Sequence, residues 1–338
     1  MSNSADAPKS RRSKRVTLRD IAEVAGVHVM TVSDALNNTR SVAPATRARI
    51  KVIAQEMNYV PNFAARALVT GRSGMIAVIS GAMNEPYYAN MVHVLEKHLM
   101  ADEYQLLLLR TPREVQHLVN SAGAASVDGA IAIDMHHLVE EFRDRAAVPC
   151  VSVGTLAHEF LDHVVIDLSE GVAQALEIML KSGRERIAYV VTAAHMARPS
   201  EVRARVYLEA MQNAGREPEI INVETDEFPV VRARLADYLR ENGCPGALMC
   251  QNDETAMIAY RALHDCGFRV PNDALLAGCD GQAHMEYFEP PLSTVVQPME
   301  EVCATAWRFL QQRLANRDLP LQSATHCGTL EVRASLSG

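Results

Sequence analysis

Residues 16–68 read VTLRDIAEVAGVHVMTVSDALNNTRSVAPATRARIKVIAQEMNYVPNFAARAL, and this stretch decides the fold of the N-terminal part. Thr17 is followed three residues later by Asp20, the pattern of a capping box, so a first helix is expected directly after it. Gly26 is expected to end that helix in a tight turn. The apolar face of this helix is formed by Leu18, Ile21, Ala22 and Ala25.

Two further short helices are predicted after this turn. The second begins at His28, ends at Asn37-Asn38 and turns Val32, Ala35 and Leu36 inward. The third opens with Pro44 and Thr46 and buries Ile50, Ile53, Ala54 and Met57. Three short helices with a glycine turn between the first two indicate a helix-turn-helix, although an ordinary three-helix bundle has the same outline.

Charge is divided unevenly along the chain of 338 residues, whose net charge is -8. Residues 1–72 hold 12 Lys and Arg against 5 Asp and Glu, a local charge of +7, which leaves -15 on the remainder. A basic head before an acidic body suggests a small module that binds a polyanion. The alternative is a basic tail that only improves solubility.

Composition narrows the class of protein. Hydrophobic residues make up 48% of the chain, which suits two or three globular domains. No apolar run reaches the length of a membrane span, and the polar, basic start MSNSADAPKSRRSKR does not resemble a secretory signal. The 7 cysteines show no C-x-x-C spacing, so reduced thiols in a cytoplasmic protein are expected.

After residue 74 short apolar runs alternate with longer amphipathic segments. The runs are residues 75–80, 105–109, 129–133, 149–153, 187–191, 219–223, 247–250 and 274–278. The segments are residues 88–100, 171–181, 203–214, 230–242 and 255–266. Strands separated by helices predict parallel sheets covered on both faces. About 265 residues with some ten strands suit two α/β lobes, with a ligand in the cleft where the strands end.

The N-terminal segment resembles the DNA-binding head of the lac repressor family. The resemblance rests on T-L-x-D-I-A, A-G-V, T-V-S, A-L-N, T-R, N-Y-x-P-N and A-R-x-L in register from residue 17 to 68. It implies a basic arm at 1–15, a helix-turn-helix domain at 16–62, a hinge helix and linker at 63–74, and an effector-binding and dimerisation body at 75–338. The implied fold is α/β, with the three-helix head and hinge helix followed by two doubly wound parallel-sheet lobes of periplasmic-binding-protein type.

The resemblance also implies roles for residues of the head. Backbone contacts to operator DNA are expected from Thr17, Thr31, Ser33, Asn37, Arg47, Tyr59 and Asn62. Val29, Met30 and Asp34 occupy the positions at which the family reads bases. The last of these positions usually carries a donor, whereas ionised Asp34 accepts, for example from a cytosine amino group. A solvated or internally paired carboxylate is the other interpretation of Asp34.

The hinge helix of the family folds on operator DNA. Ala65 and Leu68 fall in the matching segment, and Leu68 would wedge between central base pairs in the minor groove. The alternative is an exposed linker residue. A helix of about six residues is too short to be stable in water alone, which agrees with folding on DNA.

The resemblance extends over the body through MIAVIS, NEPYYANMVHVLEKHL, ASVDGAIAI, VVIDLSEG, GRERIAYV and CQNDETAMIAYRALHDCGFRVPNDALLAGCDG. It implies that Arg203, Asn252 and Asp280 bind ligand hydroxyls or a carboxylate, with Asp134 as a weaker candidate. Tyr87, Tyr88 and Phe228 supply flat faces for a sugar ring or pack in the core. Asp253 is interpreted as a helix N-terminal charge without a ligand role. Two departures, Leu168 and Val206, leave the ligand open.

Other functional classes have little support. His136 and His137 beside Asp134 lack a further ligand at helical spacing, so no metal is expected, and no cofactor or catalytic motif is evident. The expected partners are double-stranded operator DNA, a small polar effector such as a sugar, and a second copy of the chain, with no membrane. The segment THCGTLEVRAS is predicted to be a single strand. A leucine-heptad tail is missing after it, which favours a homodimer. A cytoplasmic repressor, nucleoid-associated on its operator, is predicted over an exported solute receptor or an enzyme of the same fold.

Overall fold

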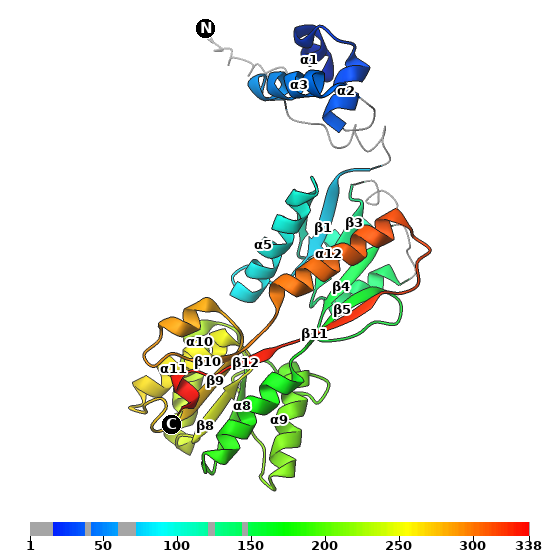
Figure 1. Cartoon of the computed structure of the whole chain (residues 1–338). Helices are drawn as coiled ribbons and strands as arrows, with labels where there is room; N and C mark the ends of the chain where they lie inside the picture. Colours follow the sequence, from blue (N-terminus) through cyan, green and yellow to red (C-terminus); the bar gives the residue numbers. More distant parts are fainter. Residues whose placement is uncertain (1–15, 38–41, 60–71, 121–125, 144–147, 338) are drawn as a thin grey trace, which may run out of the picture. The chain divides into compact units, whose positions relative to one another are not determined.

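The computed structural model describes residues 16–37, 42–59, 72–120, 126–143 and 148–337 (Figure 1). It divides into two compact units, Met1–Gly71 and Arg72–Gly338. The expected basic arm at 1–15 and the hinge residues 63–71 lie outside the described residues. The two units are called here the head and the body.

Three helices form the described part of the head, α1 (Leu18–Ala25), α2 (Val29–Asn37) and α3 (Pro44–Glu56). The predicted capping box is present, since Thr17 Oγ1 accepts from Asp20 N while Asp20 Oδ2 accepts from Thr17 N at 2.7 Å. Gly26 adopts the left-handed conformation expected at the turn, with φ 62°. The head core consists of Ile21, Ala22, Ala25, Val32, Ala35, Ile50 and Ala54, which confirms the predicted inward faces.

The body contains two sheets of the same winding. The first has the order β11-β5-β4-β3-β1-β2 and the second β12-β10-β9-β8-β6-β7. The strands of the first are β1 (Met75–Ile79), β2 (Gln105–Leu109), β3 (Gly129–Ile133), β4 (Cys150–Gly154), β5 (Asp162–Asp167) and β11 (Ser323–Cys327). Those of the second are β6 (Ile187–Val191), β7 (Glu219–Asn222), β8 (Ala247–Cys250), β9 (Leu275–Asp280), β10 (Ser293–Val296) and β12 (Thr329–Glu331). The doubly wound lobes are therefore confirmed.

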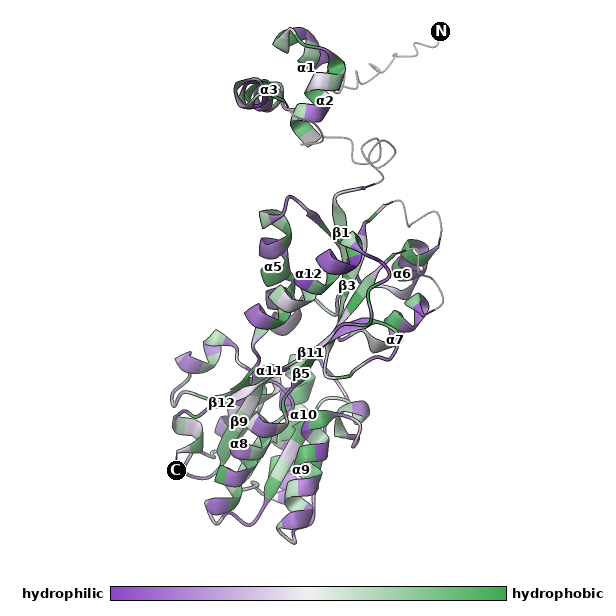
Figure 2. Ribbon diagram, turned by 45° about the vertical axis from the view of Figure 1, so that its right-hand side comes forward, coloured by the Kyte–Doolittle hydropathy of each residue, from purple (hydrophilic) through white to green (hydrophobic). Residues whose placement is uncertain are grey.

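Helices cover both faces of each sheet, and Figure 2 shows α5 and α12 on one side of β1 and β3 with α6 and α7 on the other. The first lobe carries α5 (Pro86–Ala101), α6 (Pro112–Val119), α7 (His136–Val139), the 3-10 turn η1 (Glu140–Phe142) and α12 (Met299–Ala315). The second carries α8 (Ser169–Lys181), α9 (Val202–Asn213), α10 (Phe228–Asn242), α11 (Asp253–Asp265), η2 (Ala194–Ala197), η3 (Ala283–Tyr287) and η4 (Ala334–Leu336). Burial on both faces explains why the central strands are continuous apolar runs.

The chain passes between the lobes where β5 leads to α8, where β10 leads to α12, and between β11 and β12. The last passage corrects the prediction of a single strand in THCGTLEVRAS. Gly328 separates two strands that pair in different sheets, and β12 runs antiparallel to β10. A side chain at Gly328 would meet Leu168 Cδ2 at 2.8 Å, so the close approach of the passages favours glycine there.

Candidate functional site

Helix α2 carries the residues expected to read bases, with Val29 and Met30 in its first turn and Asp34 in its second. The Met30 side chain is 57% exposed, whereas Val29 is partly buried against the head core. Thr31, Ser33 and Asp34 are half-buried along the same helix. Exposed apolar surface at Met30 therefore remains available for a contact outside the head, while Val29 contributes to packing.

The remaining residues of the head that are expected to contact DNA lie on other elements or outside the described residues. Thr17 is the N-cap of α1, and its hydroxyl lies 2.7 Å from Asp20 Oδ2. Arg47 is half-buried on α3, and Tyr59 packs against the head core. Asn37 is the last residue of α2, and its side chain lies outside the described residues. Asn62, Ala65 and Leu68 also lie outside them.

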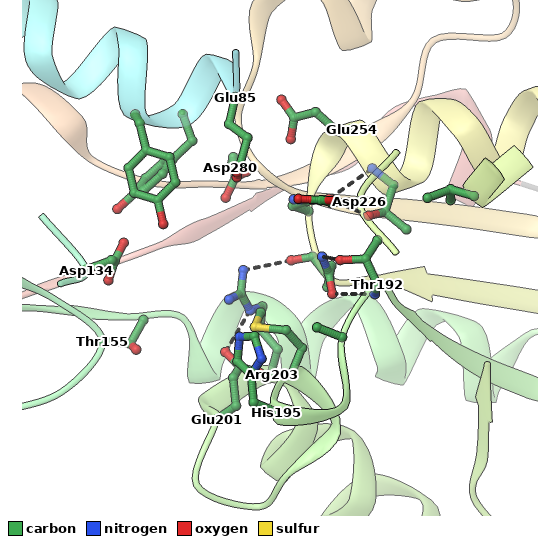
Figure 3. A pocket seen from close by; sticks show the side chains of 18 of the residues that line it. Glu85, Asp134, Thr155, Thr192, His195, Glu201, Arg203, Asp226, Glu254 and Asp280 are labelled. Carbon is green, nitrogen blue, oxygen red and sulfur yellow. Dashed lines mark hydrogen bonds and ion pairs between the residues drawn. The ribbon is translucent and has the colours of Figure 1, made fainter. Parts of the chain in front are cut away.

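A cleft of about 1500 Å³ lies between the two lobes of the body (Figure 3). It is formed where strands of both sheets end, since Asp134 follows β3, Thr192 follows β6, Gln251 follows β8 and Gln297 follows β10. All effector candidates line it, namely Tyr87, Tyr88, Asp134, Arg203, Phe228, Asn252 and Asp280. The expectation that strand ends and helix starts form one site thus brought together residues as distant in sequence as Tyr87 and Asp280, which are 193 positions apart.

Arg203 is fixed at the beginning of α9 by two acceptors. Its Nε donates to Glu201 Oε1 at 2.8 Å and its Nη1 donates to the Gln251 carbonyl at 2.7 Å. Burial lowers the pKa of Arg203, but the Glu201 carboxylate and further neighbours, including Asp280, together outweigh burial and raise this pKa well above its usual value. Gln251 is in turn held by Thr192 at 2.7 Å. The guanidinium is therefore a permanent, preoriented cation in the cleft.

Asp280 ends β9 and is almost fully buried. Its Oδ1 accepts from Gln297 Nε2 at 2.7 Å. Burial, followed by the charge of Asp253, raises the pKa of Asp280 well above its usual value. Its φ of 135° is a conformation that costs energy for a residue with a side chain and that clusters at functional sites. This strain supports a binding role for the carboxyl group.

An aromatic pair lies at the start of α5. The rings of Tyr87 and Tyr88 are 5.1 Å apart and meet edge to face. Burial, followed by the charge of Asp134 and a hydrogen bond to it, raises the pKa of Tyr87. A Cβ at Gly81 would lie 2.5 Å from Tyr88 Cε2, so glycine makes room for this ring. Tyr88 is half-buried and presents part of its ring to the cleft.

Two further candidates start helices of the second lobe. Asn252 is the N-cap of α11, and its Oδ1 accepts from Thr255 N at 2.9 Å. The side-chain oxygen of Asn252 is therefore engaged in capping, which leaves its side-chain nitrogen for a ligand. Phe228 begins α10 and is 44% exposed in the cleft.

Asp253 does not line the cleft but lies fully buried beneath it. Its Oδ1 accepts from Thr294 Oγ1 at 2.6 Å and its Oδ2 from Gln282 N at 2.7 Å. Burial, followed by the charge of Glu254, raises the pKa of Asp253 to about 7, although these two hydrogen bonds lower it. The carboxyl group thus ties α11 to the ends of β9 and β10, which is more than the helix N-terminal charge that the sequence suggested.

Sequence reasoning missed several polar residues of the lining, including Glu85, Asp226, Glu254 and Gln297. Glu254 follows the singled-out pair Asn252-Asp253, but only its burial distinguishes it from an ordinary acidic helix start. Of the two departures, Leu168 lines the cleft, whereas Val206 is buried in the core.

Within the part of the chain that the structure describes, no cluster of His, Cys, Asp and Glu is arranged to hold a metal ion. Over the same residues, no helix combines the length and apolar character needed to cross a bilayer. Cys279 is fully buried and does not line the cleft.

Family models match two parts of the chain. Residues 17–62 match bacterial regulatory proteins of the lacI family. Residues 176–336 match a periplasmic binding protein-like domain.

Relatives along the whole chain agree with both matches. The transcriptional regulator CelR of Thermobifida fusca is 31% identical over 317 residues, covering 90% of this chain and 93% of its own. The repressor PurR of Aliivibrio fischeri is 30% identical over 315 residues, covering 89% and 93%.

Solved structures share the fold. The lac repressor dimer bound to operator and the anti-inducer ONPF superposes with a TM-score of 0.78 at 21% identity, covering 96% of this chain and 99% of the other. A CelR–cellobiose complex gives 0.68 at 28% identity, covering 95% and 100%.

Proposed function

The chain belongs to the lacI family of bacterial regulatory proteins and is a DNA-binding transcription regulator, and we propose that it represses transcription from a pseudo-palindromic operator as a homodimer controlled by a small polar ligand. The observation that carries the proposal is the presence, in one chain, of a helix-turn-helix head and of a cleft with a fixed Arg203 and a strained Asp280. The first would bind DNA and the second would bind the ligand.

The head is proposed to bind DNA through the first turn of α2 in the major groove. Exposed Met30 would contact a thymine methyl group, while Asp34 would accept from a cytosine amino group. Thr17, Thr31, Ser33, Asn37, Arg47, Tyr59 and Asn62 would contact the DNA backbone, with Ala65 and Leu68 in the minor groove. The assignment rests on the positions of these residues in the family pattern.

The ligand is proposed to be a sugar or sugar derivative. Arg203 offers a planar pair of donors and Asp280 accepts from hydroxyl groups, which is how polyols are held. Tyr88 and Phe228 add partly exposed rings against which a sugar ring could stack. Among the relatives, the CelR complex contains cellobiose.

Control would follow from closure of the cleft. A ligand that contacts both lobes favours one angle between them, and its effect on DNA is limited to its differential affinity for the two states. The residues 63–74 that join head and body would transmit this change to the operator. Release of DNA on ligand binding is the direction that we propose.

Selection from random DNA duplexes with the full chain tests the proposal. We expect enrichment of a pseudo-palindrome, bound by two copies of the chain, with an affinity that falls steeply with salt. Sedimentation velocity of the protein–duplex complex measures the stoichiometry. Enrichment of no sequence, or binding by a single copy, would contradict the proposal.

A further inference from the structure

The cleft is strongly acidic. Eight of its lining residues are Asp or Glu and two are Arg. One of these arginines, Arg203, is already paired with Glu201 at 2.8 Å. An anionic ligand such as a sugar acid would therefore enter a cleft whose charge opposes it.

Glu254 and Asp280 are the two buried acidic residues of this lining. Glu254 lies in the first turn of α11, is 4% exposed, and lines the cleft. Its Oε1 is buried without any hydrogen-bond partner. Burial raises the pKa of Glu254, and the residue's own backbone N–H, followed by the nearby His284, compensates only in part. A buried carboxylate oxygen without a partner is costly, so this atom is suited to receive a donor from outside the chain.

Two more acidic residues, Glu85 and Asp226, line the same cleft, and Glu85 interacts with both Glu254 and Asp226. Glu85 comes from the opposite lobe, at the N-cap of α5, where it makes no capping hydrogen bond. Burial raises the pKa of Glu85, and the charges of Glu254 and Asp226 raise it further. Figure 3 labels Glu85, Asp226 and Glu254 among the side chains that line the cleft. We call these three residues the acidic wall, in which Glu85 of the first lobe is repelled by Glu254 and Asp226 of the second.

A second buried atom of the lining also lacks a partner. Gln297 Nε2 donates to Asp280, which leaves Gln297 Oε1 buried and unbonded. Both unpartnered lining atoms, Glu254 Oε1 and Gln297 Oε1, are acceptors. The missing partner must therefore supply donors.

The missing hydrogen-bond donors are better supplied by an organic cation than by a metal ion. Among the described residues no group of three or more His, Cys, Asp or Glu is arranged to hold a metal ion. An ammonium group has three donors and one positive charge, and a flexible or ring-shaped molecule can place it between separated carboxylates.

We propose that the effector is a small polyhydroxylated molecule with a protonated amine, an amino sugar or amino polyol, whose ammonium group binds the acidic wall. This inference rests on the proposed ligand-binding role of the cleft. The hydroxyl groups contact Arg203 and Asp280, while the ammonium group donates to Glu254 and Glu85. By neutralising repulsion between carboxylates of the two lobes, the cation favours the closed cleft.

Matched pairs of ligands test the charge requirement on the full chain. Glucosamine, galactosamine and 1-amino-1-deoxysorbitol are compared with glucose, galactose and sorbitol by calorimetric titration and thermal shift at pH 7. At least one amine is expected to bind about tenfold or more tightly than its alcohol, because hydrogen bonds to charged groups exceed neutral ones. Amines that bind no better than their alcohols, including no binding by either, overturn the inference.

Two variants test whether Glu254 causes the preference for the amine. Glu254→Gln keeps the shape but removes the charge, so the preference for the amine should disappear while the alcohol still binds. Glu241→Gln changes an exposed residue of α10 outside the cleft and should keep the preference. A preference that persists in Glu254→Gln contradicts the role of the acidic wall. Binding of a DNA duplex by the same preparations tests the proposed regulator function separately. Failure of the ligand inference can therefore be distinguished from failure of the proposed function.

Discussion

At the residue scale, the cleft is lined by side chains that emerge where strands end and helices begin, and the seven effector candidates are among them. Arg203, Asn252 and Asp280 follow or begin elements at the carboxyl end of a parallel sheet, and family likeness supplied their roles. Glu85 and Glu254 could not be predicted in this way. Acidic residues at helix starts are common, and only the packed structure shows that Glu254 is buried and lacks a partner.

Asp253 leads to a prediction at the residue scale. Its pKa is raised to about 7 in the folded chain, against about 4 when unfolded, so its contribution to stability is present at low pH and is lost as pH rises through 7. Asp253→Asn keeps one acceptor but cannot ionise. We expect the variant to be less stable than the parent near pH 5, by about 1 kcal/mol for the impaired hydrogen bond, and at least as stable near pH 8.

Urea unfolding between pH 5 and 8 measures this crossover. Asp318→Asn alters an exposed turn and should leave the pH profile of the parent unchanged. Parallel profiles for Asp253→Asn and the parent would show that Asp253 does not titrate in the folded chain.

At the scale of elements, the periodicity of apolar residues predicts where helices form better than it predicts which strands pair. The head helices are short, but the capping box at Thr17 and the glycine at 26 mark their limits. Local pattern does not identify β5 and β10, and it predicts β11 and β12 as one strand, because pairing with other parts of the chain decides which sheet each joins. In particular, nothing in the letters THCGTLEVRAS shows that Gly328 divides the segment between two sheets.

The turn of the head gives the second prediction. Gly26 has φ 62°, and a Cβ there would meet nothing within 4 Å, so Gly26→Ala should cost only backbone strain of about 1 kcal/mol. Gly26→Asn should cost less, because asparagine tolerates this conformation. We expect faster amide hydrogen exchange in α1 and α2 of the Gly26→Ala variant, and weaker operator binding.

Gly183 provides a matched control in the body. Its φ is 76°, and again nothing lies within 4 Å of an added Cβ. Gly183→Ala should therefore destabilise the body by a similar amount and leave exchange in the head unchanged. Equal exchange rates in the head of Gly26→Ala and the parent would mean that the turn does not limit its stability.

At the scale of the whole molecule, charge separates the two activities. Residues 1–72 carry +7 and the remainder carries -15, so the body repels a polyanion that the head attracts. The acidic lining of the cleft is part of this body charge. In the proposed function, a single chain would thus present opposite charge to DNA and to a cationic effector.

This division predicts how DNA binding depends on salt. If Arg47 contacts a phosphate, Arg47→Ala should weaken binding to every duplex by a similar factor and lower the slope of log affinity against log salt by about 1 per contact. Arg308→Ala removes an exposed positive charge from α12 in the body and should leave the slope unchanged. Fluorescence anisotropy with operator and scrambled duplexes from 50 to 200 mM KCl, about a fourfold range, resolves this difference. An unchanged slope in Arg47→Ala would remove Arg47 from the DNA interface, while a loss confined to the operator would assign it to base reading.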